Sequence, residues 1–207
     1  GIQKINIAHY SKLKYFYATD NGLTEIIGAR GEHGKTLADK CPELVEVDIS
    51  NNYYISQFDI GEHQKIRKLN ISNNDFVNLS LNNLPSLKEL YAGYNDDLQA
   101  LYLMNDPALE KLDLCCAGTE DFAIAMDDSG LPGLKYLDIS YSDIVVDTNT
   151  AAFWAKMPSL ETLDISYADS VYVNFWDSGL PNLKELIADG YNYDQLYVGA
   201  LPTLEKI

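Results

Sequence analysis

Apolar residues recur along the chain in a fixed local frame with strand-like alternation. The frame places apolar residues at its first, fourth and sixth positions, as in "LKYLDIS" at 134–140. Alternation of apolar and polar residues is typical of a strand with one buried face. Full frames begin at eight positions, and a truncated ninth begins at Leu204; the eight are Leu13, Leu44, Ile66, Leu87, Leu109, Leu134, Leu160 and Leu183.

The spacing of the frames predicts that they stack. From Leu44 onward, successive frames begin 21 to 26 residues apart, after a first interval of 31 residues. A unit of this length has too little apolar surface to close a core alone, so neighbouring copies must share one. We therefore expect one parallel sheet from the segments around 46–50, 68–72, 89–93, 111–115, 136–140, 162–166 and 185–189.

Proline and the second half of each unit support this prediction. All seven prolines lie two residues before the first position of a frame, as Pro132 does before Leu134. Proline lacks an amide donor and is tolerated just before a strand begins. Apolar pairs two residues apart then predict extended second halves at Phe58/Ile60, Leu79/Leu81, Leu101/Leu103 and Leu196/Val198. A longer unit contains "TNTAAFWAKM", where Thr148 or Thr150 is expected to cap a short helix.

Asparagine extends the frame in the first half of the chain. The ninth position holds Asn21, Asn52, Asn74 and Asn95 in the first four frames, and then Ala117, Ser142, Ala168 and Tyr191 in the last four. The combined pattern resembles the leucine-rich repeat family, whose units of 20–29 residues read L-x-x-L-x-L-x-x-N/C-x-L. The resemblance extends over nearly the whole chain, although the asparagine ladder is not expected to continue beyond Asn95.

The resemblance implies a fold and a location. It implies an α/β solenoid, a right-handed superhelix with one parallel concave sheet and mostly extended convex segments. Residues 1–207 would form a single leucine-rich-repeat domain of about eight repeats, with partial units at both ends. Short, extended convex segments look like those of bacterial surface proteins, which implies a secreted, extracellular or cell-surface protein. Open repeat ends predict continuation of the chain, a covering partner or self-association.

Composition narrows the possible partners. Fifteen Lys and Arg against 31 Asp and Glu leave a formal charge of −16, which repels nucleic acids and anionic membrane surfaces. No apolar run approaches the roughly 18 residues needed for a membrane span. Cys41, Cys115 and Cys116 are too few for a disulfide framework and leave the compartment open.

The surface of the predicted sheet supplies the candidate binding site. Its fifth-position column reads Tyr17, Asp48, Asn70, Tyr91, Asp113, Asp138, Asp164 and Ile187, and its eighth-position column reads Asp20, Asn51, Asn73, Tyr94, Cys116, Tyr141, Tyr167 and Gly190. From these columns we select the candidate ligand-binding residues Tyr91, Tyr94, Asp113, Asp138, Tyr141, Asp164 and Tyr167. The aspartates fit a cation, basic side chains or simply a solvated face, and the tyrosines fit a protein hot spot, sugar stacking or mere strand preference.

Catalysis finds little support in the sequence. His9, His33 and His63 have no matching zinc-ligand spacing, and no phosphate loop or nucleophile elbow is present. Cys115 and Cys116 are adjacent, so their side chains are expected to point in different directions. We therefore predict no enzyme, no catalytic residue, no cofactor and no metal. The predicted function is a binding module for a protein ligand on the concave face, with glycan binding through tyrosines or a structural spacer in a larger surface protein as alternatives.

Overall fold

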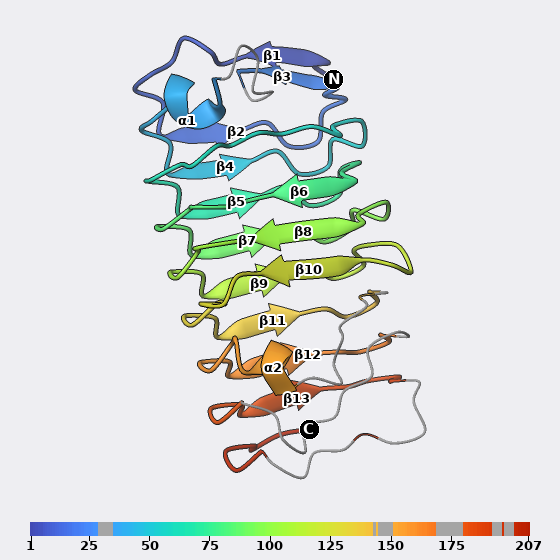
Figure 1. Cartoon of the computed structure of the whole chain (residues 1–207). Helices are drawn as coiled ribbons and strands as arrows, with labels where there is room; N and C mark the ends of the chain where they lie inside the picture. The colour runs from blue at the N-terminus through green and yellow to red at the C-terminus, as the bar shows by residue number, and fades with distance from the viewer. Residues whose placement is uncertain (29–34, 143, 145–150, 169–179, 192–195, 197–200) are drawn as a thin grey trace.

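The chain folds into a parallel β-solenoid, described here from a computed structural model for residues 1–28, 35–142, 144, 151–168, 180–191, 196 and 201–207. Figure 1 shows the strands stacked in one column, with the two termini at opposite ends. One long sheet contains eight parallel strands, and its order follows the sequence: β2 (Tyr15–Tyr17), β4 (Glu46–Asp48), β5 (Lys68–Asn70), β7 (Glu89–Tyr91), β9 (Lys111–Asp113), β11 (Tyr136–Asp138), β12 (Thr162–Asp164) and β13 (Glu185–Ile187). The prediction of a stacked parallel solenoid is confirmed.

The register of the long sheet keeps equivalent frame positions side by side. Leu137 in β11 pairs with Leu112 in β9 and with Leu163 in β12, and all three side chains are buried. Each observed strand spans only the third to fifth positions of its frame, whereas the predicted segments extended to the seventh. The strands are shorter because a turn begins at the fifth position, as described below.

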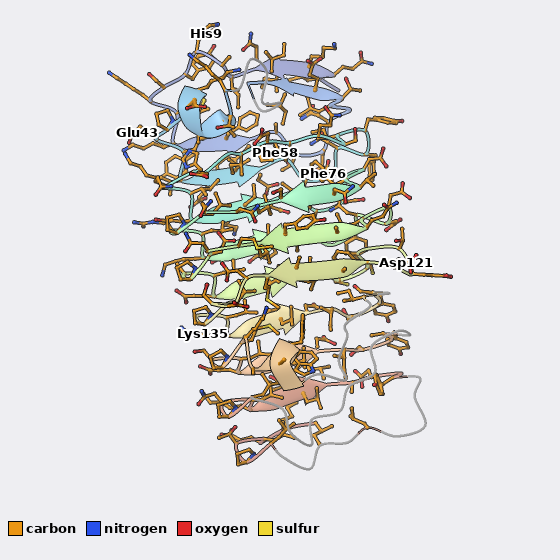
Figure 2. All side chains as sticks on the ribbon, viewed as in Figure 1. His9, Glu43, Phe58, Phe76, Asp121 and Lys135 are labelled. Atoms are coloured by element: carbon orange, nitrogen blue, oxygen red, sulfur yellow. The ribbon has the colours of Figure 1, made fainter. Side chains whose placement is uncertain are left out.

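A second layer packs behind the long sheet. The short sheet contains β6 (Asn78–Ser80), β8 (Ala100–Leu103) and β10 (Ala123–Met126), and β1 (Lys4–Asn6) pairs with β3 (Glu25–Ile27) nearer the N-terminus. The predicted apolar pairs Phe58/Ile60, Leu79/Leu81 and Leu101/Leu103 are buried, whereas Leu196 is only partly buried. Val198 lies outside the described residues. Figure 2 shows Phe58 and Phe76 within the stack, while Glu43 and Lys135 project from its edge.

In the described part of the chain, two short helices interrupt the stack. Helix α2 (Ala151–Trp154) lies in the segment predicted to be helical, but the proposed caps Thr148 and Thr150 lie outside the described residues. Helix α1 (Leu37–Lys40) was not predicted. The amide of Thr36 donates to the Asp39 carboxylate at 2.9 Å, so a Thr-x-x-Asp signal for this helix was present in the sequence.

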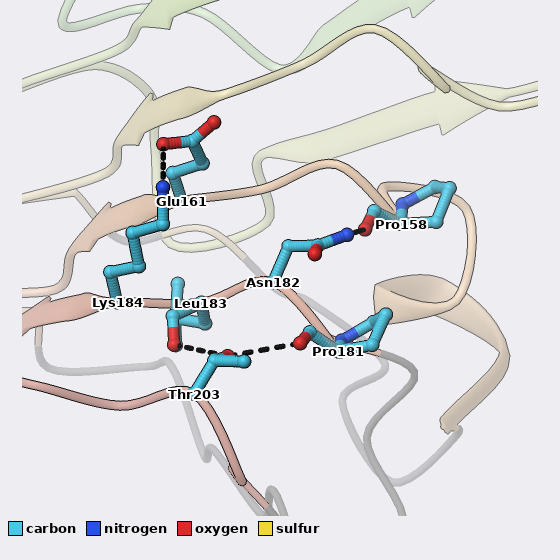
Figure 3. A network of polar contacts seen from close by, with 7 residues as sticks. All are labelled: Pro158, Glu161, Pro181, Asn182, Leu183, Lys184 and Thr203. Carbon is cyan, nitrogen blue, oxygen red and sulfur yellow. Dashed lines mark hydrogen bonds and ion pairs between the residues drawn. The ribbon is translucent and has the colours of Figure 1, made fainter.

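The proline positions have a second use, which Figure 3 illustrates. The Asn182 amide donates to the Pro158 carbonyl at 2.8 Å, and the Thr203 hydroxyl donates to the Pro181 carbonyl at 2.9 Å. In each case, the residue that follows one proline donates a hydrogen bond to the carbonyl of the proline in the preceding repeat. These turns are therefore joined between repeats without using the amide that proline lacks.

The asparagine ladder is present where it was predicted. Asn74 donates to the carbonyls of Ile49, Ile71 and Ser72, while its Oδ1 accepts the amide of Asn52 at 3.2 Å. Asn52 and Asn95 make equivalent bonds in their own turns. Each asparagine thus satisfies backbone groups that would otherwise be buried without partners.

Candidate functional site

The fifth-position aspartates end the strands of the long sheet. In Asp138, Oδ1 accepts the Ser140 amide at 2.9 Å and the Ser140 hydroxyl at 2.6 Å. Asp164 and Asp113 accept the amide two residues later in the same way, at 2.9 and 3.3 Å. A side chain that bonds its own backbone two residues on competes with the sheet ladder and favours a turn. These aspartates are half-buried and neighbours in the sheet, with one oxygen each committed to the local turn.

The eighth-position residues all occupy a left-handed turn, and we call them the turn column. Their φ angles lie between +53° and +60° at Asp20, Asn51, Asn73, Tyr94, Cys116, Tyr141, Tyr167 and Gly190. The backbone amide of each tyrosine donates across to the next repeat; that of Tyr141, for example, bonds the Ser166 carbonyl at 2.8 Å. Alternation along a strand did not reveal this turn. Asparagine and glycine in the same column are the signal that could have identified it.

The tyrosines of the turn column stand at the surface. Tyr94, Tyr141 and Tyr167 are 54%, 55% and 48% exposed, so about half of each side chain remains open to a partner. Tyr141 stacks on Tyr167 with ring centroids 4.6 Å apart and an interplanar angle of 14°. A Cβ added at Gly190 would lie 2.2 Å from the Tyr167 ring, so the backbone of Gly190 packs closely against that ring.

Tyr91 differs from the other candidate tyrosines because it is already engaged. The ammonium groups of Lys68 and Lys111 lie 5.2 and 4.8 Å from its ring centroid, within cation–π range. Its hydroxyl donates to Glu89 at 3.1 Å, and burial raises the pKa of Tyr91 to about 12. Lys68 and Lys111 were not among the predicted site residues, although both occupy the third position of the frame, on the same side of the strand as the fifth-position column.

Charge on the long sheet is mixed at close range, despite the net charge of −16. Lys111 also lies 4.7 Å from the ring centroid of Tyr136, whose hydroxyl donates to Asp138 at 3.3 Å. Burial and the neighbouring Asp138 raise the pKa of Asp113. The predicted column of aspartates therefore has lysine and tyrosine neighbours that moderate its charge.

The structure corrects one expectation about the cysteines. Cys115 and Cys116 were expected to point in different directions, but their sulfur atoms lie 3.5 Å apart. The expectation was wrong because it assumed strand alternation, whereas the strand ends at Asp113 and Cys116 adopts a left-handed conformation. Both thiols are free and half-buried. We call Cys115 and Cys116 the thiol pair.

A polar hollow lies beside β6, in the second layer. It has a volume of about 530 Å³ and is lined by Phe58 and Gly61, by the carboxylates of Asp59 and Glu62, and by neutral polar residues: Ser56, Gln57, Asn78, Ser80, Asn82 and Asn83. Among the residues that the structure describes, no lysine or arginine lines it. The hollow therefore suits neutral or cationic ligands with many hydrogen-bonding groups.

The described part of the chain contains neither a cluster of metal ligands nor a membrane-spanning helix. There, no three His, Cys, Asp or Glu residues come together to hold a metal ion. Nor is any described helix long and apolar enough to cross a membrane. His63 is buried, and its Nε2 lies 3.0 Å from the Cys41 carbonyl, where burial lowers its pKa.

Comparison with known proteins adds no family. A scan against protein-family models finds no match, and a search of curated proteins finds no significant relative. Function is therefore proposed from the geometry and the repeat pattern of this chain.

Proposed function

We propose that this chain is a leucine-rich-repeat binding module that recognises a protein ligand with the turn column and the adjacent face of the long sheet. Tyr94, Tyr141 and Tyr167 would be the apolar anchors, and Asp138 and Asp164 would supply polar contacts at their side. The concave shape of that face and a location at the surface of a bacterial cell are parts of this proposal. They rest on the resemblance of the repeat pattern and of the extended second halves.

The conformation of the three tyrosines carries the proposal. A residue other than glycine in the left-handed region costs roughly 1–2 kcal/mol, and asparagine tolerates that region best among the rest. The same column contains Asn51, Asn73 and Gly190, so residues better suited to this backbone occur in neighbouring repeats. Tyrosine at three such positions is a local cost that folding does not require. Strain of this kind is found where a side chain is needed for binding.

The arrangement of the rings favours a protein over a sugar as the ligand of this column. Stacking on a sugar requires an open aromatic face. Tyr141 covers one side of the Tyr167 ring, and the backbone of Gly190 approaches that ring as well. What Tyr167 offers is its edge and its hydroxyl group, which suit the mixed apolar and polar contacts of a protein interface.

Replacement of all three tyrosines by asparagine tests the proposal. Asparagine suits the left-handed turn, so the triple variant Tyr94→Asn, Tyr141→Asn and Tyr167→Asn should fold at least as stably as the wild type. Wild-type protein would be used to select binders from a library of displayed protein domains, and affinities would be measured by calorimetry. We expect each anchor to contribute roughly 1–2 kcal/mol, so the triple variant should bind at least about a hundredfold more weakly.

Tyr102→Asn provides the matched control. Tyr102 is an exposed tyrosine in β8 of the short sheet, on the other layer of the solenoid. It should leave the affinity unchanged. If the folded triple variant retains the affinity of the wild type, or if Tyr102→Asn weakens binding equally, the ligand does not use the turn column.

The polar hollow favours a second candidate function, the binding of a glycan. Amide and hydroxyl groups such as those of Asn78, Ser80 and Asn82 are well suited to hydrogen-bond sugar hydroxyls. A glycan array probed with wild-type protein and with Asn78→Ala would test this site separately. Binding to the array that survives Asn78→Ala but not the triple tyrosine variant would place the glycan on the turn column instead.

A further inference from the structure

The thiol pair lies in a defined environment within the turn column. Cys116 occupies the repeat between those of Tyr94 and Tyr141, and it is much smaller than either tyrosine. Two sulfur atoms 3.5 Å apart thus lie between two exposed aromatic side chains.

A disulfide is a poor use of these two thiols. The Cα atoms of adjacent residues are about 3.8 Å apart across a trans peptide, below the roughly 4.4–6.8 Å that an unstrained disulfide spans. The two sulfur atoms would also have to approach each other by more than 1 Å from their present separation of 3.5 Å to reach the bonded distance of about 2.05 Å. The present separation suits a different arrangement, in which both sulfur atoms bind one central atom.

The sulfur separation selects the geometry of that central atom. With bonds of about 2.3 Å to sulfur, a separation of 3.5 Å subtends an angle of about 100° at the centre. A linear two-coordinate ion with the same bonds would need sulfur atoms about 4.6 Å apart. Pyramidal trivalent arsenic, whose bond angles are a little above a right angle, fits without rearrangement, and a tetrahedral metal ion fits nearly as well.

The number of available ligands separates these two kinds of centre. Among the described residues, no His, Asp or Glu joins the thiol pair to make a group of three metal ligands. A tetrahedral ion would therefore leave half of its coordination to solvent. A trivalent arsenical that carries one organic group is complete with two sulfur atoms.

We propose that Cys115 and Cys116 form a bidentate site for trivalent arsenic species, with weaker binding of tetrahedral thiophilic metal ions. Binding is a condensation: an arsenic oxide reacts with two thiols to give two arsenic–sulfur bonds and one water molecule. The two S–H bonds and the arsenic–oxygen bonds break, and both thiol protons leave in the water. Arsenic remains trivalent, so no oxidant or reductant takes part.

Proton release distinguishes the two kinds of centre. A metal ion must displace both thiol protons, so its affinity should rise with pH. The condensation takes up neutral thiols and carries their protons away as water, so its affinity should vary little between pH 6 and pH 8.

Phenylarsine oxide is the probe that tests the site, with the reduced 207-residue chain as the target. We expect one adduct per chain in the intact mass, and a fall in titratable thiols from three to one. Cys115→Ser and Cys116→Ser should each weaken the adduct at least about a hundredfold, because only one sulfur bond remains. Cys41→Ser should retain it, since Cys41 is buried elsewhere and its thiol donates to the Ile7 carbonyl.

Two comparisons keep the proposal falsifiable if a variant folds poorly. The folded wild type should bind phenylarsine oxide at least as tightly as the same chain in urea, where the two adjacent cysteines have no fixed geometry. Cadmium binding, followed by its thiolate charge-transfer absorption, should be weaker and should strengthen with pH. Binding in urea but not in the folded state, or an adduct that persists in both serine variants, would overturn the proposal.

Discussion

Asp106 offers a quantitative test of how the solenoid tolerates a buried charge. It belongs to a core column, three residues before each frame from Leu44 onward, that otherwise contains Cys41, His63, Leu84, Leu131, Met157, Leu180 and Leu201. Its side chain is fully buried, and Oδ1 accepts the Leu84 amide at 2.7 Å. Among the described residues, Oδ2 has no hydrogen-bond partner. Ionisation of this carboxyl group therefore costs more in the folded protein than in water.

The magnitude follows from the pKa. Burial, with a smaller contribution from Asp127, raises the pKa of Asp106 from 3.8 to about 6, against the opposing effect of the Leu84 amide. A difference of this size corresponds to about 3 kcal/mol. Because the folded pKa is the higher one, protonation of Asp106 stabilises the folded state. This contribution is complete below pH 3.8 and is lost as the pH rises through about 6.

Asp106→Asn isolates the effect, since asparagine keeps the acceptor for the Leu84 amide and does not titrate. Urea unfolding would be followed by circular dichroism for both proteins at pH 5 and pH 8. Relative to the variant, the wild type should gain about 1.4 kcal/mol in unfolding free energy at pH 5 compared with pH 8. Asp97→Asn, at an exposed aspartate, controls for the loss of one charge. A relative gain below about 0.3 kcal/mol would refute the burial argument.

Three further predictions concern the repeat itself. Leu137→Ala should lower the unfolding free energy by roughly 2–5 kcal/mol, and a loss below about half a kcal/mol in denaturant melts would contradict the register of β11. Asn74→Ala should cost roughly 1–3 kcal/mol by leaving the buried Asn52 amide without its acceptor, and unchanged hydrogen exchange of that amide would count against the ladder. Gly190→Ala should displace the Tyr167 ring and cost roughly 1 kcal/mol or more, whereas unshifted Tyr167 ring resonances would contradict the close approach.

Local sequence determined the architecture of this protein. A leucine frame such as the one at Leu134 buries one side of a three-residue strand, and no frame can complete its core without a neighbour. Each proline marks the position just before a strand begins, because proline is excluded from the hydrogen-bond ladder of the sheet. Seven of the eight strands described in the long sheet, their parallel order and the asparagine ladder through Asn95 could therefore be predicted, whereas β2, in the frame that begins at Leu13, was not among the predicted segments. The exposure of Tyr94, Tyr141 and Tyr167 could also be predicted from their place in the frame.

Contacts between repeats decided the rest of the candidate site. The engagement of Tyr91 by Lys68 and Lys111, and the stacking of Tyr141 on Tyr167, join residues about one repeat apart in sequence. Alternation along one strand contains no information on such pairs. The approach of the two cysteine sulfur atoms depends on a left-handed turn at Cys116. That turn is stabilised by the bond of the Cys116 amide to the Ser140 carbonyl of the next repeat, so it forms only when the repeats stack.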